Sequence, residues 1–213
     1  MLKKFSIALC VSSLFGAGVA MADPGSSNGQ ISFTGKVTHE APTVVVKRGT
    51  SGTGDSLSSN PEIQLGEYTA SELDKKTEFY VDKSRKFQIV IQRPAGTAYN
   101  HITEVDVKLT ANIENKIVVN DLERDNVTTS AKNVGVAIQY YGTSGYTDAG
   151  SNAFAGKEDG SAAVSFSEPS GGFAYAEVDP TFYFAAALQQ LDTSEAIGGG
   201  SVKSTVNVEV EYK

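Results

Sequence analysis

Apolar and polar residues alternate along most of this chain, with a period of two. The clearest stretch is the last one, in which Val202, Val206, Val208, Val210 and Tyr212 share one face and the residues between them are mostly polar. Successive side chains of an extended strand point to opposite faces, so this pattern is typical of a half-buried β-strand. The same alternation elsewhere predicts an all-β chain.

Further strands are expected where β-branched and aromatic residues recur between turn residues. They cover 43–47, 63–68, 78–81, 87–91, 102–111, 117–122, 134–140, 162–166 and 173–188, with a break at Asp179-Pro180 in the last of these. Residues 49–61 and 142–160 are predicted to be polar surface connections, the second with a hairpin around Phe154, and 71–76 to form one helical turn at most. About ten short strands separated by turns predict a β-sandwich with Greek-key connections.

A second alternating stretch stands apart near the start of the chain. Its apolar face holds Ile31, Phe33, Gly35 and Val37, and its other face is polar. It follows a polar, flexible lead over 23–28, so it is tethered at one end of the domain. We expect a strand here that can pair outside its own domain.

The first 22 residues have the three parts of a secretory signal peptide. Lys3 and Lys4 form the positive start, 5–20 the short apolar core, and Ala20-Met21-Ala22 the cleavage site. No other apolar stretch approaches the roughly 20 residues that a membrane-spanning helix requires. The mature protein is therefore expected to be exported and soluble.

The mature chain is acidic and has no cysteine. The net charge of the whole sequence is −7, and loss of Lys3 and Lys4 makes it more negative, which argues against nucleic acid or an anionic membrane surface as a partner. Cys10, the single cysteine, leaves with the signal peptide, so no disulfide is expected. The remainder reads as an N-terminal extension over 23–40 and one domain over 41–213.

The sequence offers no converging set of reactive groups. His39 and His101 are the two histidines, and no zinc-binding pair, nucleophile elbow, phosphate loop or dinucleotide fingerprint occurs. Asp121, Glu123 and Asp125 form an acidic cluster, but the glycine and distal glutamate of a calcium-binding EF-hand loop are missing, so a solvated turn is preferred. We expect neither an enzyme nor a bound cofactor or metal.

Three tyrosines lie close together near a Gly-rich loop. Tyr140, Tyr141 and Tyr146 could contact a sugar or a receptor, or they could cap the core at the end of a strand. Aromatic residues at a strand end more often pack on the core, so the capping role is preferred.

Four segments resemble the subunits of chaperone-usher fimbriae, the pilins of Gram-negative bacteria. The family's N-terminal extension is similar to Gly29-Gln30-Ile31-Ser32-Phe33-Thr34-Gly35-Lys36-Val37, and its early hydrophobic-x-Leu-Gly segment is similar to Glu62-Ile63-Gln64-Leu65-Gly66. Its Asn-Val-Gly-hydrophobic-x-Ile strand is similar to Asn133-Val134-Gly135-Val136-Ala137-Ile138. Its terminal strand is similar to the end of this chain, where Tyr212 stands before Lys213. Many such pilins carry a disulfide, whereas this chain has Ala41-Pro42 and Gln92-Arg93 where the cysteines would be expected. The resemblance is therefore to a type 1-like pilin without the usual disulfide.

This resemblance implies an incomplete immunoglobulin-like β-sandwich that a donor strand from a neighbouring subunit completes. Ile31, Phe33, Gly35 and Val37 would be the donor face. The edge of the acceptor groove would be the strand bearing Val206, Val208, Val210 and Tyr212. Implied partners are other fimbrial subunits in a head-to-tail homopolymer, a periplasmic chaperone, an outer-membrane usher and a host receptor, with passage through the periplasm and assembly on the cell surface.

A different class of function also fits the residues. The chain could be a secreted, self-contained β-sandwich adhesin or carbohydrate-binding module, in which 29–37 is merely its own first strand. An extracellular hydrolase is the least favoured reading because no catalytic site is recognisable.

Overall fold

The structure is a computed structural model that describes residues 26–28, 42–49, 54–76, 78–92, 104–146, 149–168 and 179–213. Its strands are β1 (Ser26–Asn28), β2 (Thr43–Arg48), β3 (Gly54–Ser56), β4 (Arg85–Gln92), β5 (Val105–Glu114), β6 (Ile117–Val118), β7 (Val134–Tyr140), β8 (Ser151–Asn152), β9 (Gly160–Glu168), β10 (Thr181–Gln190) and β11 (Asn207–Tyr212). Two single-turn α-helices, α1 (Ala70–Leu73) and α2 (Asp121–Arg124), and two 3₁₀ turns, η1 (Leu57–Ser59) and η2 (Val81–Lys83), complete the described elements. The all-β expectation is confirmed.

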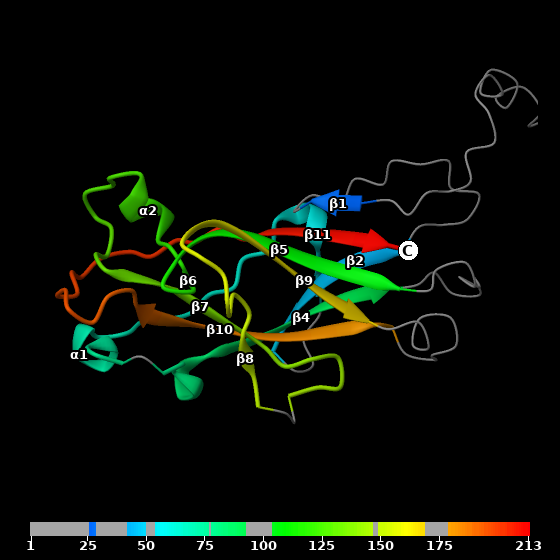
Figure 1. Ribbon diagram of the computed structural model, residues 1–213, viewed down its shortest axis with the longest axis horizontal. Coiled ribbons are helices and arrows are strands. Elements are labelled where there is room, and N and C mark those ends of the chain that lie inside the picture. Colours follow the sequence, from blue (N-terminus) through cyan, green and yellow to red (C-terminus); the bar gives the residue numbers. More distant parts are fainter. Residues whose placement is uncertain are drawn as a thin grey trace, which may run out of the picture.

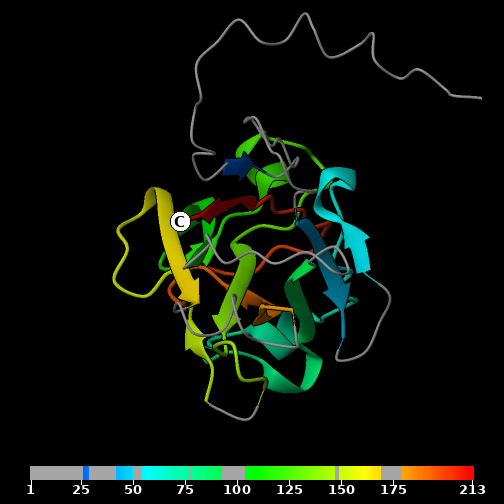
Figure 2. The same ribbon diagram turned by 90° about the vertical axis from the view of Figure 1, so that its right-hand side faces the viewer.

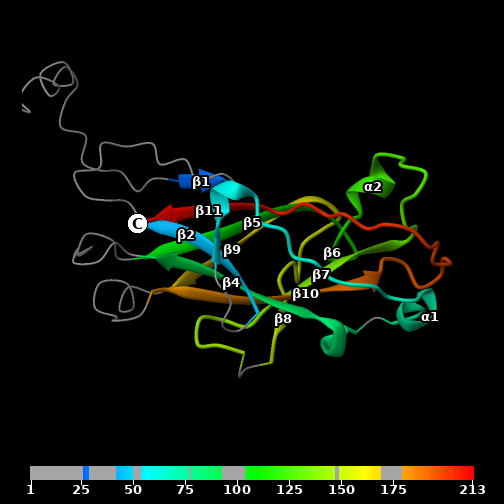
Figure 3. The same ribbon diagram turned by 180° about the vertical axis from the view of Figure 1, so that it is seen from behind.

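Every pairing between the named strands is antiparallel. The hydrogen-bonded order is β1-β11-β5-β6-β7-β10-β4-β2-β3, with β9 on β5 and β8 on β7. The long strand β5 pairs with β11 along 105–110 and with β6 at Ile113 and Glu114, while β9 runs along its other edge. Figure 1 and Figure 3 show α1 and α2 at one end of the molecule and the C-terminus at the other.

The strands enclose one hydrophobic core. Its cluster of buried side chains draws on β2, β4, β5, β7, β9, β10 and β11, and Figure 2 shows these strands around a common interior. The largest fully buried side chains are Phe154, Phe182, Phe184, Ile89, Ile91 and Leu109. Full burial of each such side chain stabilises the fold by about 1.5 to 3 kcal/mol relative to exposure. A core without cysteine therefore rests on apolar packing between strands.

Most expected strands are present, and several have the expected bounds within a few residues. The stretch predicted over 134–140 is β7, the one over 43–47 is β2, and the one over 162–166 is β9, extended at both ends. The single helical turn expected within 71–76 is α1, which starts at Ala70. Period-two alternation thus located the strands that line the core.

The strand predicted over 63–68 is not formed. Ile63 and Leu65 are half-buried against the core and alternate with exposed residues, as expected of an extended segment. This segment has no partner strand among the described residues, and Gly66 adopts a positive φ of 85°. The apolar–polar alternation of this segment therefore reflects the packing of its side chains on the core. It does not reflect backbone hydrogen bonds to a neighbouring strand.

Two other strand predictions are wrong in part because local hydrogen bonds turn the chain. Within 117–122 the strand stops at Val118, and α2 begins after Asn120, whose side chain accepts a hydrogen bond from the backbone N–H of Leu122. Such a cap favours a helical turn over a strand. Residues 78–81 are not a strand either, and η2 starts at Val81.

The predicted loop over 49–61 is more ordered than its composition indicates. It contains β3, which pairs with β2, and η1, whose Leu57 is 3% exposed. The buried side chain of Leu57 thus attaches this segment, which is otherwise rich in glycine and serine, to the core.

Candidate functional site

The last strand, β11, has a hydrogen-bonded strand on each of its edges. One neighbour is β5, which pairs with all six residues of β11. The other neighbour is the short strand β1, in which Ser26 pairs with Glu211 and Asn28 with Glu209. Figure 1 shows β1 beside β11, near the C-terminus. The described residues nearest the N-terminus therefore pair with the edge of the C-terminal strand that β5 leaves open.

The side chains predicted to form the acceptor edge share the core side of β11. Val208, Val210 and Tyr212 are buried, and Val206, directly before the strand, is half-buried against the core. The residues between them are exposed or half-buried. β11 thus has an apolar side that faces the core and a polar side that faces outward.

The flexible lead predicted over 23–28 needs a correction, because residues 26–28 form β1. Their polar sequence has no apolar alternation, so no periodicity could have predicted a strand there. The strand exists because the edge of β11 opposite β5 supplies its backbone hydrogen-bond partners. The predicted donor residues Ile31, Phe33, Gly35 and Val37 lie outside the described residues. His39, His101 and residues 1–22, which are predicted to form a signal peptide, lie outside them too.

The end of β11 is tied to the start of β5 by its last residue. Lys213 and Glu104 exchange backbone hydrogen bonds of 2.9 and 3.2 Å between N and O. The Lys213 ammonium also binds the Glu104 carboxylate, with Nζ 3.1 Å from Oε1, and the carboxylate of Asp106. Sequence reasoning missed this contact, although Glu104 and Asp106 are two apart and so share a face of their strand.

The charges in this contact depend on one another. Burial of Asp106 by itself would raise the pKa of its carboxyl group, but hydrogen bonds from Lys213 and Ser167 outweigh the burial and hold the pKa below its usual value. The hydrogen bond with Asp106 in turn raises the pKa of the Lys213 ammonium. The C-terminal residue is therefore a fully charged clamp on β5.

Before β11, the chain is fastened by the buried side chain of Asn120. Its Nδ2 donates to the carbonyl oxygens of Ala131 and Ser201, at 3.0 and 3.2 Å, and its Oδ1 accepts from the backbone N–H groups of Leu122 and Lys203. All four hydrogen-bonding positions of the amide are used. Asn120 thus fixes the segment that leads into β11.

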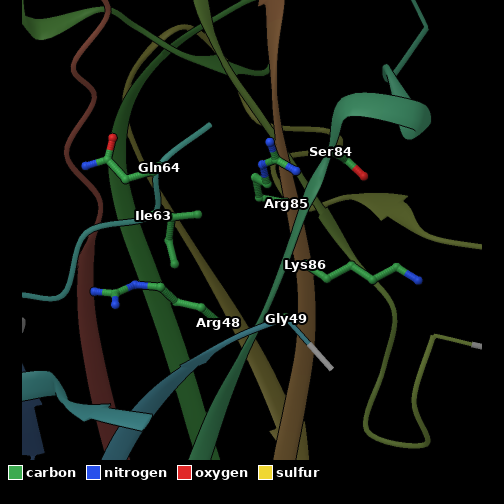
Figure 4. Close-up of a pocket in the computed structure, with 7 residues that line it drawn as sticks. All are labelled: Arg48, Gly49, Ile63, Gln64, Ser84, Arg85 and Lys86. Atoms are coloured by element: carbon green, nitrogen blue, oxygen red, sulfur yellow. The ribbon is translucent and has the colours of Figure 1, made fainter. Parts of the chain in front are cut away.

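A cavity of about 340 Å³ opens between the end of β2 and the start of β4. It is lined by Arg48, Gly49, Ile63, Gln64, Ser84, Arg85 and Lys86. Figure 4 shows the three cationic side chains pointing in different directions. Arg48 pairs with Asp55 at 2.7 Å, and Lys86 Nζ lies 4.6 Å from the ring centre of Tyr146. The cations therefore do not converge on a common ligand.

The tyrosines considered as a binding patch take part in internal packing. Tyr140 lies with its ring centre 4.2 Å from that of Phe166 and 5.1 Å from that of Phe184. The Tyr146 hydroxyl donates to the carbonyl oxygen of Phe87 at 2.8 Å, with that of Phe184 at 3.2 Å, and burial raises the pKa of this hydroxyl. Tyr141 packs edge-on against Tyr146 at 5.3 Å. These are the contacts of residues that cap a core.

The acidic cluster at α2 is bound to protein groups. Arg124 pairs with Asp121 at 3.0 Å and with Asp125 at 3.4 Å, and the Glu123 carboxylate accepts a hydrogen bond from the backbone N–H of Asn133. Within the described part of the chain, no three His, Cys, Asp or Glu side chains gather in a group that could hold a metal ion.

Among the described residues, the edge of β11 opposite β5 is paired only at Glu209, Val210 and Glu211, by β1. This edge is thus well suited to binding another chain, since it accepts a strand through backbone hydrogen bonds. No helix among the described residues is long and apolar enough to cross a membrane.

Searches against protein-family models and against curated proteins found no match for the chain.

Proposed function

We propose that this chain is a structural subunit of a chaperone-usher fimbria. In this proposal the fold is an incomplete immunoglobulin-like β-sandwich with Greek-key connections, and subunits polymerise head to tail by donor-strand exchange. The chain acts as an assembly and adhesion protein, without catalytic activity or a cofactor.

The strand order supports an immunoglobulin-like β-sandwich as the fold. β9, β5 and β11 form one run of paired strands, and β7, β10, β4 and β2 form a second, while β6 is the link between them. Both runs contribute to the same core cluster. Two antiparallel runs that share one core are what an immunoglobulin-like sandwich requires.

The single observation that carries the functional proposal is the pairing of β1 with β11. Residues 26–28 pair antiparallel with the edge of β11 opposite β5, and they directly precede the stretch that is expected to be the donor strand. An unpaired edge is a template for strand addition. We infer that the same edge takes the N-terminal extension of a neighbouring subunit during assembly.

The proposed exchange has a source of binding free energy in the apolar residues of the extension. Ile31, Phe33 and Val37 would enter the groove beside β11, each contributing roughly 1.5 to 3 kcal/mol before ordering costs. Gly35 would pass where the groove is shallow. Backbone hydrogen bonds along β11 would add to the binding free energy and would exclude water from the strand edge.

Donation that runs head to tail does not close on itself, so it produces a filament. Before assembly the exposed edge would be hazardous, which is the reason for a periplasmic chaperone and an outer-membrane usher in this proposal. The filament would stand on the cell surface, where a host receptor is the expected target.

Replacing Gly35 tests the proposal in the whole protein. Gly35→Arg places a long side chain on the inserted face, so fibres seen by electron microscopy should be lost. Thr34→Arg is the matched control, because Thr34 lies on the opposite face of the same predicted strand and its variant should still form fibres. Loss of fibres in both variants, or in neither, would refute the assigned role of Gly35.

One observation also fits the second candidate, a self-contained β-sandwich adhesin or carbohydrate-binding module. β1 pairs with β11 of its own chain, as a first strand would. Deletion of residues 23–36 separates the two candidates. A donor-strand subunit should remain folded with its chaperone and fail to polymerise, whereas a self-contained module should lose stability because one of its own strands is missing.

A further inference from the structure

Strand β9 uses only one of its two edges within the described part of the chain. All nine of its residues pair with β5, from Gly160 opposite Ile113 to Glu168 opposite Val105. No other described backbone group is hydrogen-bonded to it. Figure 2 shows β9, in yellow, at the margin of the molecule. No described strand therefore covers the second edge of β9, which is nine residues long.

This edge lacks the features that normally protect an edge strand. From Ser161 to Ser167 it contains no charged residue and no proline. The side chains of Ala162 and Val164 are buried and that of Phe166 is half-buried, while the alternate positions carry only serine and alanine. Lysine, proline or a bulge usually keeps such an edge from pairing with another chain.

The other described edges differ in this respect. β11 is already paired with β1, and its outward residues include Glu209 and Glu211. β3 has three residues, one of them Asp55 in an ion pair with Arg48, and β8 has two residues. Among the described strands, β9 therefore presents the one long edge without a second partner, and it has no charged residue between Ser161 and Ser167.

We propose that the β9 edge is a contact between two copies of this chain, paired antiparallel about a twofold axis at Val164. This arrangement sets Ala162 of one copy opposite Phe166 of the other, and Ala163 opposite Ser165. A large side chain thus meets a small one, and no like charges face each other although the chain carries a net charge of −7. The surface is self-complementary, as a twofold contact requires.

A single contact of this kind is weak. One pair of short strands buries less than the roughly 800 Å² per partner that is typical of a stable interface. The paired form should therefore appear only at high protein concentration. If the chain also forms fibres as proposed above, repeated β9 edges along two fibres would act together and hold the fibres side by side.

Sedimentation equilibrium of the whole protein over a range of concentrations tests the contact. The wild type should form a species of twice the monomer mass at high concentration, and Ala163→Lys should lose it because a lysine then lies at the paired edge. Within its own chain Ala163 lies opposite Thr110 of β5, so the added lysine faces no like charge there. Thr205→Lys is the matched control, because Thr205 is exposed outside β9 and its variant should still dimerise.

A mixture of Ala163→Lys and Ser165→Glu tests the register of the pair. These positions face each other across the proposed twofold axis, so the mixture should regain the dimer that Ala163→Lys lacks. Ser165 lies opposite Lys108 in its own chain, where a glutamate is well accommodated. Failure of the mixture to dimerise would refute the Val164 register.

Two further results decide the proposal as a whole. In β9 one alternate set of amides points to β5 and the other set points away from it. If the amides that point away from β5 are protected from hydrogen exchange in the monomer, the edge is covered within the chain and the proposal is wrong. Dimers that persist in Ala163→Lys would also overturn it. The contact is separable from donor-strand assembly, since Gly35→Arg should remove fibres and leave the β9 dimer, whereas Ala163→Lys should do the reverse.

Discussion

Ser27 of β1 and Val210 of β11 are register partners, and Val210 is paired on its other side with Val107 of β5. The Val210 side chain is completely buried. The middle of β11 is therefore bounded by strands on both edges and by the core on one face. Changes at this position should affect the fold directly.

Val210→Ala should lower the free energy of unfolding by about 2 kcal/mol, because it removes two buried methyl groups and leaves a cavity that the neighbouring strands can fill only in part. Urea denaturation monitored by circular dichroism measures the change. Glu211→Ala is the control on the exposed face of the same strand and should change the value by no more than about 0.5 kcal/mol. Equal losses in the two variants would contradict the burial pattern of β11.

Gly135→Ala should destabilise the protein by about 2 kcal/mol, because a Cβ atom there would overlap the carbonyl oxygen of Val118 and lie 2.9 Å from Cγ2 of Ile117. Thermal unfolding monitored by calorimetry measures the loss. Gly199→Ala is the control, since no atom lies within 4 Å of its added Cβ, and its melting temperature should be almost unchanged. A stable Gly135→Ala protein would show that β6 and β7 can move apart.

The pKa of Glu72 should be about 2, far below the ordinary value of 4.5. The main cause is the hydrogen bond with Lys83, whose Nζ lies 2.6 Å from Oε1, followed by hydrogen bonds from Thr69 in the capping box of α1. Because the folded-state pKa is depressed, the contribution to stability is complete above pH about 4.5 and is lost as the pH falls towards 2.

A carboxyl titration by NMR checks this value. Lys83→Met should raise the pKa of Glu72 towards its ordinary value, since it removes the strongest hydrogen bond to the carboxylate. Lys86→Met makes the same charge change at a lysine that lies over the Tyr146 ring, and it should leave the titration of Glu72 nearly unchanged. An unaltered pKa in Lys83→Met would refute the contact.

Lys213→Met should raise the pKa of Asp106, because burial of this carboxyl group is then no longer outweighed by the ammonium. In the wild type the depressed pKa stabilises the fold above the ordinary pKa of 3.8, and this contribution is lost as the pH falls below it. The variant should therefore unfold at a higher pH during acid titration.

Tryptophan is absent from the chain, so far-ultraviolet circular dichroism is the suitable readout for this acid titration. Lys203→Met is the matched control, since the Lys203 side chain is exposed, and its acid midpoint should stay near that of the wild type. Coincident midpoints for Lys213→Met and the wild type would show that the clamp does not contribute to acid stability.

The motif around Gly135 illustrates what a resemblance can and cannot predict. The sequence Asn133-Val134-Gly135 predicts the start of a strand, and β7 does begin at Val134. The reason for each residue became visible only in the fold. Asn133 adopts a φ of 57° and its Nδ2 donates to the carbonyl oxygens of Asp192 and Glu195, while Gly135 leaves room for β6.

Side-chain alternation along an extended backbone is a local property, so the amino-acid pattern alone predicts an all-β chain and locates most of its core strands. It also singled out Val208, Val210 and Tyr212 as one buried face. Which strand edges meet depends on the fold. β1 is a strand because β11 supplies its backbone partners, and 63–68 is not a strand because none of the described residues pairs with it. Backbone pairing depends on the neighbouring strand, and the neighbour is set by the fold.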